Sequence, residues 1–356
     1  MKGNGVSYSS FDDRYTSKEM NELFLGSAKL PIWRKLWAAL LEAGKELGFG
    51  VTDEQIEKIQ SMTEADLDST SYYISDNTNI ILIREAFQII EAKLLELIKV
   101  LTDFAGITKE VLVPSYINDR MEMLITVEKL AMLWMQNFTE NLNELNFVAS
   151  NLKIVGCPGF TNPSEIFAEL VSKDGLVLGG LDFMEADAKY EEFNALLARS
   201  LGFCKDKLIP GNPMDPDDYD TIVEDSRIYP VSGLAYPRNF DFQVLNALAA
   251  IGASAYKMVQ DIRLLRCDKE LERLFERHRV NSSAMAYRQN PMHRERFCCS
   301  LAKYLSGLSA TIWDVAATQT FKSAADDFSY VSDAFRVTDA ILILCIDIIG
   351  KAQTDD

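Results

Sequence analysis

Positive charge is scarce in this sequence. Its 36 lysines and arginines stand against 53 aspartates and glutamates, which leaves a formal net charge of −17. Proteins that bind nucleic acid present a basic surface, and anionic membranes also attract basic segments. We therefore expect no nucleic-acid partner and no membrane partner. A small anionic ligand would need a local cluster of arginines.

Long apolar runs and paired cysteines are missing as well. The longest apolar run, residues 340–350, is interrupted by Asp347 and is too short to span a bilayer. The six cysteines form no CxxC pair, which is typical of a reduced intracellular protein. The polar first 15 residues contain no signal-peptide core. These absences predict a cytoplasmic protein, and we expect neither a metal ion nor a cofactor.

Apolar residues, in contrast, recur at helical spacing in five long segments. The clearest stripe runs from Ile83 to Phe104 in alternating steps of four and three, as in helices that pack in bundles. Further stripes cover residues 127–145, 244–265, 297–315 and about 331–348. With 48% hydrophobic residues the chain can bury a sizeable core. The pattern predicts an all-α fold, a bundle of long helices.

Some local signals refine this expectation. Asp76 or Asn77 is suited to cap the helix that contains the first stripe, and Thr52 with Gln55 matches a capping box. Residues 207–230 combine prolines with aspartates and glutamates, so we expect a flexible acidic insertion at the surface.

A polar loop precedes the fourth stripe. It reads Asn281-Ser282-Ser283-Ala284-Met285-Ala286-Tyr287-Arg288-Gln289-Asn290-Pro291, and its Asn-Pro step disfavours regular structure. Because a helix is expected to begin just after it, backbone N–H groups and the helix dipole favour a bound anion there. Arg288, Arg294 and Arg296 add positive charge. From these residues alone, a solvated connector explains the loop equally well.

The loop resembles the GSSxMPxKxNP signature of the fumarase/aspartase superfamily, and its continuation to Ala302 resembles adenylosuccinate lyases in particular. The opening from Arg14 to Met20 is similar to the RYxSxEM motif of these lyases, residues 69–78 to their TSxxVxDNT segment, and residues 232–238 to SGQTYxR. The resemblance covers most of the chain.

This resemblance implies a bundle of the fumarase/aspartase type. We expect a small, internally shortened N-terminal helical domain at residues 1–75, a central bundle domain at 76–356, and no C-terminal domain. It also implies a role in AMP biosynthesis, the β-elimination of fumarate from adenylosuccinate. Ser282 stands where the family has its catalytic base. The implied substrate-binding residues are Arg14, Tyr15, Thr70, Ser71, Arg238, Arg288 and Asn290.

The sequence departs from the family pattern where chemistry is concentrated. Asn281 replaces a glycine, Ala286 a proline and Arg288 a lysine. Residues 113–120, where the family carries the histidine of THxQxA as general acid, contain no histidine, and the family's substrate helix before Ser69 is missing. A positioned general acid typically contributes ~10²–10⁴-fold to the rate.

Three functional hypotheses follow. The first is a working lyase with rearranged catalytic groups. The second, which we favour, is a catalytically impaired, lyase-like protein that still binds AMP or adenylosuccinate, or a non-catalytic pseudoenzyme. Its expected partners are copies of itself or a related lyase, in a homo-oligomer or a hetero-oligomer through the stripes at residues 83–104 and 244–265. The third is a shortened copy without a settled fold.

Overall fold

The computed structural model describes residues 15–48, 50–61, 72–117, 120–156, 183–209, 221–229, 235–265, 293–318 and 328–350. The chain divides into two compact units. Unit 1 comprises Met1–Phe24, Glu85–Ser150 and Arg238–Asp356, and unit 2 comprises Leu25–Arg84 and Asn151–Pro237. The expected domain boundary at residues 75–76 lies inside one helix, α4 (Tyr72–Ile107), and stays a prediction.

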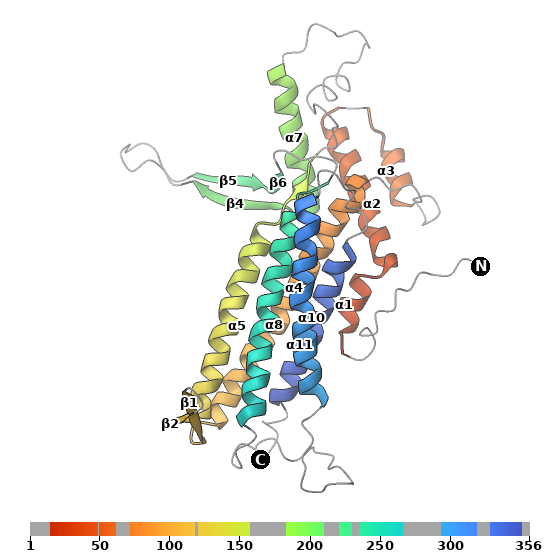
Figure 1. The fold of residues 1–356 in the computed structure, drawn as a ribbon. Coiled ribbons are helices and arrows are strands. Elements are labelled where there is room, and N and C mark those ends of the chain that lie inside the picture. Colours follow the sequence, from red (N-terminus) through yellow and green to blue (C-terminus); the bar gives the residue numbers. More distant parts are fainter. Residues whose placement is uncertain are drawn as a thin grey trace, which may run out of the picture. The chain divides into compact units, whose positions relative to one another are not determined.

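Unit 1 is the predicted helical bundle. Its long helices are α4 from Glu85 onward, α5 (Val127–Ser150), α8 (Asn239–Leu265), α10 (His293–Thr318) and α11 (Phe328–Gly350), all visible in Figure 1. Helix α8 packs against α5, α10 and α11, and the short helix α1 (Lys18–Leu23) packs against α11. Among the described residues, no helix is both long and apolar enough to cross a membrane.

The stripes predicted from the sequence form the core of this bundle. On α4 the described stripe residues from Phe87 to Phe104 are at most 3% exposed, and on α8 the residues from Val244 to Ile262 are fully buried. The described residues of both stripes are buried within one chain. Oligomerisation through the stripes stays a prediction.

The apolar stripe predicted for residues 297–315 included Tyr304, and at this position the prediction is wrong. Tyr304 is 42% exposed, whereas its neighbour Leu305 is fully buried. The reason is a close approach between α8 and α10 at Gly252, where an added Cβ would lie 3.1 Å from the Cδ2 atom of Leu305. The glycine leaves room for Leu305, and this turns Tyr304 toward the surface.

A two-stranded antiparallel pair interrupts the helices of unit 1. Strand β1 (Leu112–Ile117) pairs with β2 (Arg120–Thr126), with Leu112 opposite Thr126 and a register shift between Ser115 and Tyr116. This pair contains the stretch in which the family resemblance places a histidine.

Unit 2 contains α2 (Gly26–Glu46), α3 (Asp53–Gln60), the start of α4 and α7 (Phe183–Leu201). Helix α2 packs against α3 and α7, and Ala43 and Phe193 lie in the core between α2 and α7. The backbone N–H of Thr52 donates to the Oε1 atom of Gln55 at 3.0 Å, which confirms the predicted cap of α3.

The other two sheets also belong to unit 2. Strand β3 (Ile154–Val155) pairs in parallel with β6 (Ile228–Tyr229), and β4 (Cys204–Ile209) pairs antiparallel with β5 (Thr221–Ser226). The stretch expected to be a flexible acidic insertion, residues 207–230, therefore has paired strands at both ends. Its most acidic part, residues 210–220, lies outside the described residues.

Candidate functional site

Two segments of the candidate site, far apart in the sequence, meet in unit 1. The ring of Tyr15, from the opening motif, packs against the ring of Phe297 with a centroid distance of 4.6 Å and an interplanar angle of 40°. Phe297 is the fifth residue of α10, the helix that follows the signature loop. The described end of the opening motif and the first turns of α10 therefore lie side by side.

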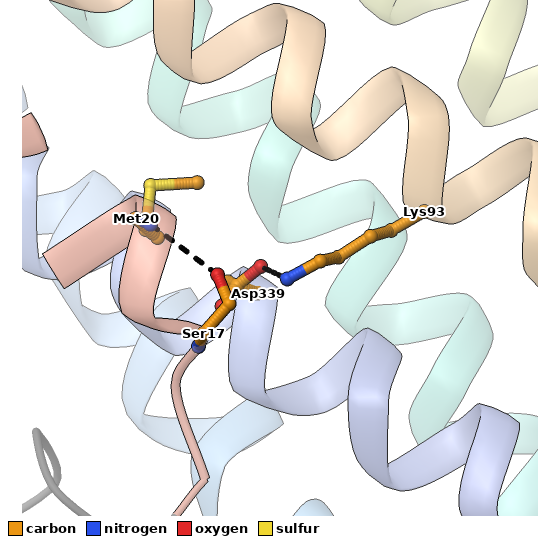
Figure 2. A network of polar contacts seen from close by, with 4 residues as sticks. All are labelled: Ser17, Met20, Lys93 and Asp339. Carbon is orange, nitrogen blue, oxygen red and sulfur yellow. Dashed lines mark hydrogen bonds and ion pairs between the residues drawn. The ribbon is translucent and has the colours of Figure 1, made fainter.

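Ser17 fixes the opening motif to the bundle (Figure 2). Its backbone N–H donates to the Oδ2 atom of Asp339 on α11 at 2.7 Å, and the other carboxylate oxygen forms an ion pair with Lys93 on α4. The hydroxyl of Ser17 accepts a hydrogen bond from the backbone N–H of Met20 at 3.3 Å and so caps α1. One carboxylate thus connects three segments of unit 1.

Apolar contacts complete the attachment of α1. Met20 is fully buried, and the ring of Phe24 stacks on that of Phe335 with centroids 6.0 Å apart. Phe335 in turn meets Phe87 of α4 edge-on at 5.4 Å. Helix α1 is therefore held against α11 at both of its ends.

The first turn of α10 carries less free positive charge than the sequence suggests. Arg294 forms an ion pair with Asp347 near the end of α11, and Arg296 is exposed. Glu295, between them, is fully buried. Because a nearby carboxylate compensates Arg294, this arginine contributes little attraction for an anionic ligand.

Arg238, a predicted substrate-binding residue, precedes α8 and is only 4% exposed. Its Nη1 atom lies 3.6 Å from the Oδ2 atom of Asp241, which is buried as well. The carboxylate therefore takes up part of the charge of Arg238, and a bound anion would compete with it.

Asp76 and Asn77, which match the DN of the family's TSxxVxDNT segment, form hydrogen bonds within unit 2. The side chain of Asn77 pairs with both backbone groups of Val155, accepting from its N–H at 2.9 Å and donating to its carbonyl at 3.2 Å. Asp76 accepts from the backbone N–H of Tyr236 at 3.3 Å. The expectation that either residue caps α4 is wrong, because the helix begins at Tyr72 and both residues lie within it.

The buried thiols near the start of α10 are poor nucleophiles. The Sγ atoms of Cys298 and Cys345 are 3.9 Å apart. Their hydrogen bond, together with burial, raises the pKa of Cys345 well above its usual value, and burial raises the pKa of Cys299. Because the thiolate is the reactive form, neither residue is suited to covalent catalysis.

Most of the predicted site residues lie outside the described residues: Arg14, Thr70, Ser71, Ser282, Arg288 and Asn290. Tyr15 and Arg238 are described, and both belong to unit 1. Within the described ranges no group of histidine, cysteine, aspartate and glutamate side chains is arranged to hold a metal ion. An open cleft of about 450 Å³ on unit 2, between α2, Gln60 and Ser200, contains none of the predicted site residues.

Sequence reasoning missed Asp339 and Lys93. A signal for Asp339 was present, because it directly precedes the apolar run that begins at Ala340. A lone acid in such a stretch indicates a buried, paired carboxylate. Nothing in the sequence distinguishes Lys93 from Lys99, the other lysine on α4.

Comparison with known proteins identifies relatives of this chain. No protein-family model matches it. It is 30% identical to the adenylosuccinate lyase of Saccharomyces cerevisiae, over 94% of this chain and 71% of the relative, and 29% identical to that of Schizosaccharomyces pombe, over 95% and 71%.

Solved structures agree on the fold. A fumarate lyase from Mesorhizobium matches with a TM-score of 0.66 and 13% identity, over 96% of this chain and 76% of that one. A 3-carboxy-cis,cis-muconate lactonizing enzyme from Pseudomonas putida matches with a TM-score of 0.65 and 14% identity, over 95% and 76%. The chain therefore belongs to the adenylosuccinate lyase family and has the long-helix bundle fold of fumarase/aspartase-type lyases.

Proposed function

We propose that this protein binds an anionic purine nucleotide, such as AMP, and catalyses the elimination of fumarate from adenylosuccinate poorly or not at all. The observation that supports it best is the contact between Tyr15 and Phe297, which brings the opening motif to the helix that follows the signature loop. This contact supports a nucleotide site, whereas residues 113–120 lack the histidine that the family uses as general acid.

The proposed nucleotide site begins with Arg14 and Tyr15. A guanidinium can hold a phosphate through two parallel hydrogen bonds, and a phenol hydroxyl can donate a third. The loop from Ser282 to Asn290 would add backbone donors. The chain's net charge of −17 opposes an anion. At physiological ionic strength, however, only acids within about 8 Å matter much.

Elimination makes further demands. A base must remove a proton from carbon, an acid must protonate the departing amine, and charge on the carboxylate must be stabilised. Ser282 matches the base, but a serine needs nearby cations or donors to stabilise its alkoxide. Arg288 retains the charge of the family lysine, but its planar guanidinium group does not have the geometry of the compact lysine ammonium.

The general acid has no replacement among Val113, Pro114 and Ser115 of β1. Val113 is fully buried, and Pro114 and Ser115 are half-buried in β1. None of these side chains can supply a proton near neutral pH. The loss of a positioned acid alone is expected to slow the reaction ~10²–10⁴-fold.

Fumarate release from adenylosuccinate by the purified protein tests the proposal, with the Saccharomyces cerevisiae relative as the active reference. We expect a rate at least ~100-fold below the reference. Calorimetry should detect AMP binding, with adenylosuccinate gaining little over AMP because Arg294 is engaged by Asp347.

A Ser282→Ala variant serves as the control. Turnover close to that of the reference, lost in this variant, would contradict the proposal. Adenylosuccinate binding far more tightly than AMP would contradict it too, because it would require a second anion pocket.

A second candidate function is association with another lyase subunit without catalysis. It is favoured by exposed apolar side chains around the β1–β2 pair, which are 46–59% exposed: Ile107, Leu112, Met121, Met123 and Leu124. Light scattering should then give a mass above that of one chain, and Met121→Lys with Met123→Lys should lower it. Phe147→Lys, a change at another exposed apolar residue, is the matched control. A monomer at micromolar concentration, alone and mixed with a related lyase, would rule this candidate out.

A further inference from the structure

We propose that Asp339 and Lys93 are positioning residues for the nucleotide site: they hold the backbone of the opening motif so that Tyr15 meets the phosphate. The inference rests on the proposed function in so far as Tyr15 binds a nucleotide. Neither Asp339 nor Lys93 belongs to a motif by which the family was identified.

Both oxygens of Asp339 are occupied. One accepts from the backbone N–H of Ser17 at 2.7 Å, and the other pairs with the ammonium of Lys93, as Figure 2 shows. The carboxylate is fully buried and the Lys93 side chain is 15% exposed. Ser17 and Asp339 are 322 positions apart in the sequence. The carboxylate therefore ties the N-terminal segment to the middle of the bundle.

Stability alone does not explain a buried ion pair at this place. Desolvating two charges costs about as much as their attraction returns, and apolar residues of similar volume often stabilise a protein equally well. An apolar pair, however, could not accept the N–H of Ser17. A buried N–H without an acceptor is itself unfavourable. The distinctive contribution of the carboxylate is therefore the hydrogen bond to Ser17.

That bond determines where the opening motif lies. Ser17 has an extended backbone, with φ −65° and ψ 150°, and caps α1. Two residues earlier, Tyr15 packs on Phe297 of α10. The segment from Tyr15 to Ser17 is thus attached at both ends. Fixing a backbone before a ligand arrives removes an entropy cost from binding, and for one or two residues this corresponds to roughly ten-fold in affinity.

Two double variants separate the effect of losing the hydrogen-bond acceptor for Ser17 from the effect of losing the two charges. Lys93→Met with Asp339→Leu removes both charges and the acceptor, whereas Lys93→Met with Asp339→Asn removes both charges but keeps an oxygen for the N–H of Ser17. We expect the Leu variant to bind AMP roughly ten-fold more weakly than wild type and the Asn variant to stay within about three-fold. A purely structural role would change the melting temperatures of the variants without separating their AMP affinities.

Ser17 offers a second test that leaves the buried pair intact. Its φ of −65° matches that of proline, so Ser17→Pro removes the N–H donor with little change in backbone angle. Ser17→Ala retains the N–H and loses only the hydroxyl cap, which makes it the matched control. If the Leu variant does not fold, weaker AMP binding by the Pro variant than by the Ala variant supports the proposal. Equal AMP binding by the two overturns it.

Hydrogen exchange separates this inference from the proposed function. The peptide spanning residues 15–24 should exchange faster in the Leu variant than in the Asn variant, whether or not a nucleotide binds. If wild type binds no AMP, the proposed function fails, and the exchange rates still decide whether the Asp339 carboxylate holds the backbone of the opening motif. Equal exchange rates in the two variants, or equal AMP affinities in a protein that does bind AMP, overturn the inference.

Discussion

Replacing Asn77 by alanine should destabilise unit 2 more than the loss of an ordinary polar side chain. Asn77 is fully buried and Val155 is 2% exposed. The asparagine side chain occupies both the N–H and the carbonyl of Val155, at 2.9 and 3.2 Å, and so replaces a neighbouring strand at one edge of β3. On the other side, the N–H of Ile154 donates to the carbonyl of Arg227 at 3.0 Å.

The size of the effect follows from these contacts. Truncation leaves two buried backbone groups without a partner, and each such group costs about 1–3 kcal/mol. We therefore expect Asn77→Ala to lower the free energy of unfolding by about 3 kcal/mol, well above the typical surface substitution. Asn77→Asp should be at least as harmful at neutral pH, because it places a carboxylate oxygen against the Val155 carbonyl. Its deficit should shrink as the pH falls and that carboxyl is protonated.

Urea unfolding followed by circular dichroism measures the loss, and hydrogen exchange at the Val155 amide locates it. Asn143→Ala, at an exposed position of α5, is the control and should stay within about 0.5 kcal/mol of wild type. If Asn77→Ala costs under about 1 kcal/mol and the Val155 amide stays protected, the structural role assigned to Asn77 is refuted.

Three further predictions concern the end of α7, the reactivity of the thiols and the pKa of Cys345. Arg84 donates to the carbonyls of Leu201 and Gly202 at 2.9 and 3.4 Å, and its guanidinium carbon lies 4.5 Å from the centroid of the Phe203 ring. Arg84→Lys should therefore lower the free energy of unfolding by about 1–2 kcal/mol, measured by thermal unfolding, although the charge is retained. A loss no larger than that of Arg34→Lys, which affects an exposed hydrogen bond to the Gln60 carbonyl, would speak against this prediction. Half-buried Cys204 should react with iodoacetamide well before Cys298 and Cys345, as read by mass spectrometry. The pKa of Cys345 is raised in the native state, so the folded protein keeps this proton to higher pH than the unfolded chain does. The contribution of Cys345 to the free energy of unfolding should therefore be complete below about pH 8.5 and decline above it. A free energy of unfolding that rises from about pH 8.5 to about pH 10 would contradict this expectation.

The helices were predictable because burial enforces their spacing. On α4 the steps of four and three from Phe87 to Phe104 place each apolar side chain on one face, and that face is the buried one. The strands β1 and β2 were not predicted. Met121, Met123 and Leu124 are all exposed, so no alternation of buried and exposed residues reveals a strand.

The candidate site was predictable only as a set of motifs. The opening and signature motifs could be read from the sequence, but the contact of Tyr15 with Phe297, on the helix after the signature loop, joins residues 282 positions apart (297 − 15). The role of Ser17 depends on Asp339, on a different helix, and no local pattern connects the two. Pairings between distant residues are set by tertiary packing, which propensity and periodicity do not encode.

The structure also changes what a motif match in this family can mean. Asp76, Asn77 and Ser17 all stand within family-like motifs, and each makes a hydrogen bond that holds the fold together. A chain without catalytic activity would still need these three residues in order to fold. Their presence therefore says little about activity. For this reason fumarate release, rather than a closer motif match, is the observation that decides between a lyase and a protein that keeps only its nucleotide site.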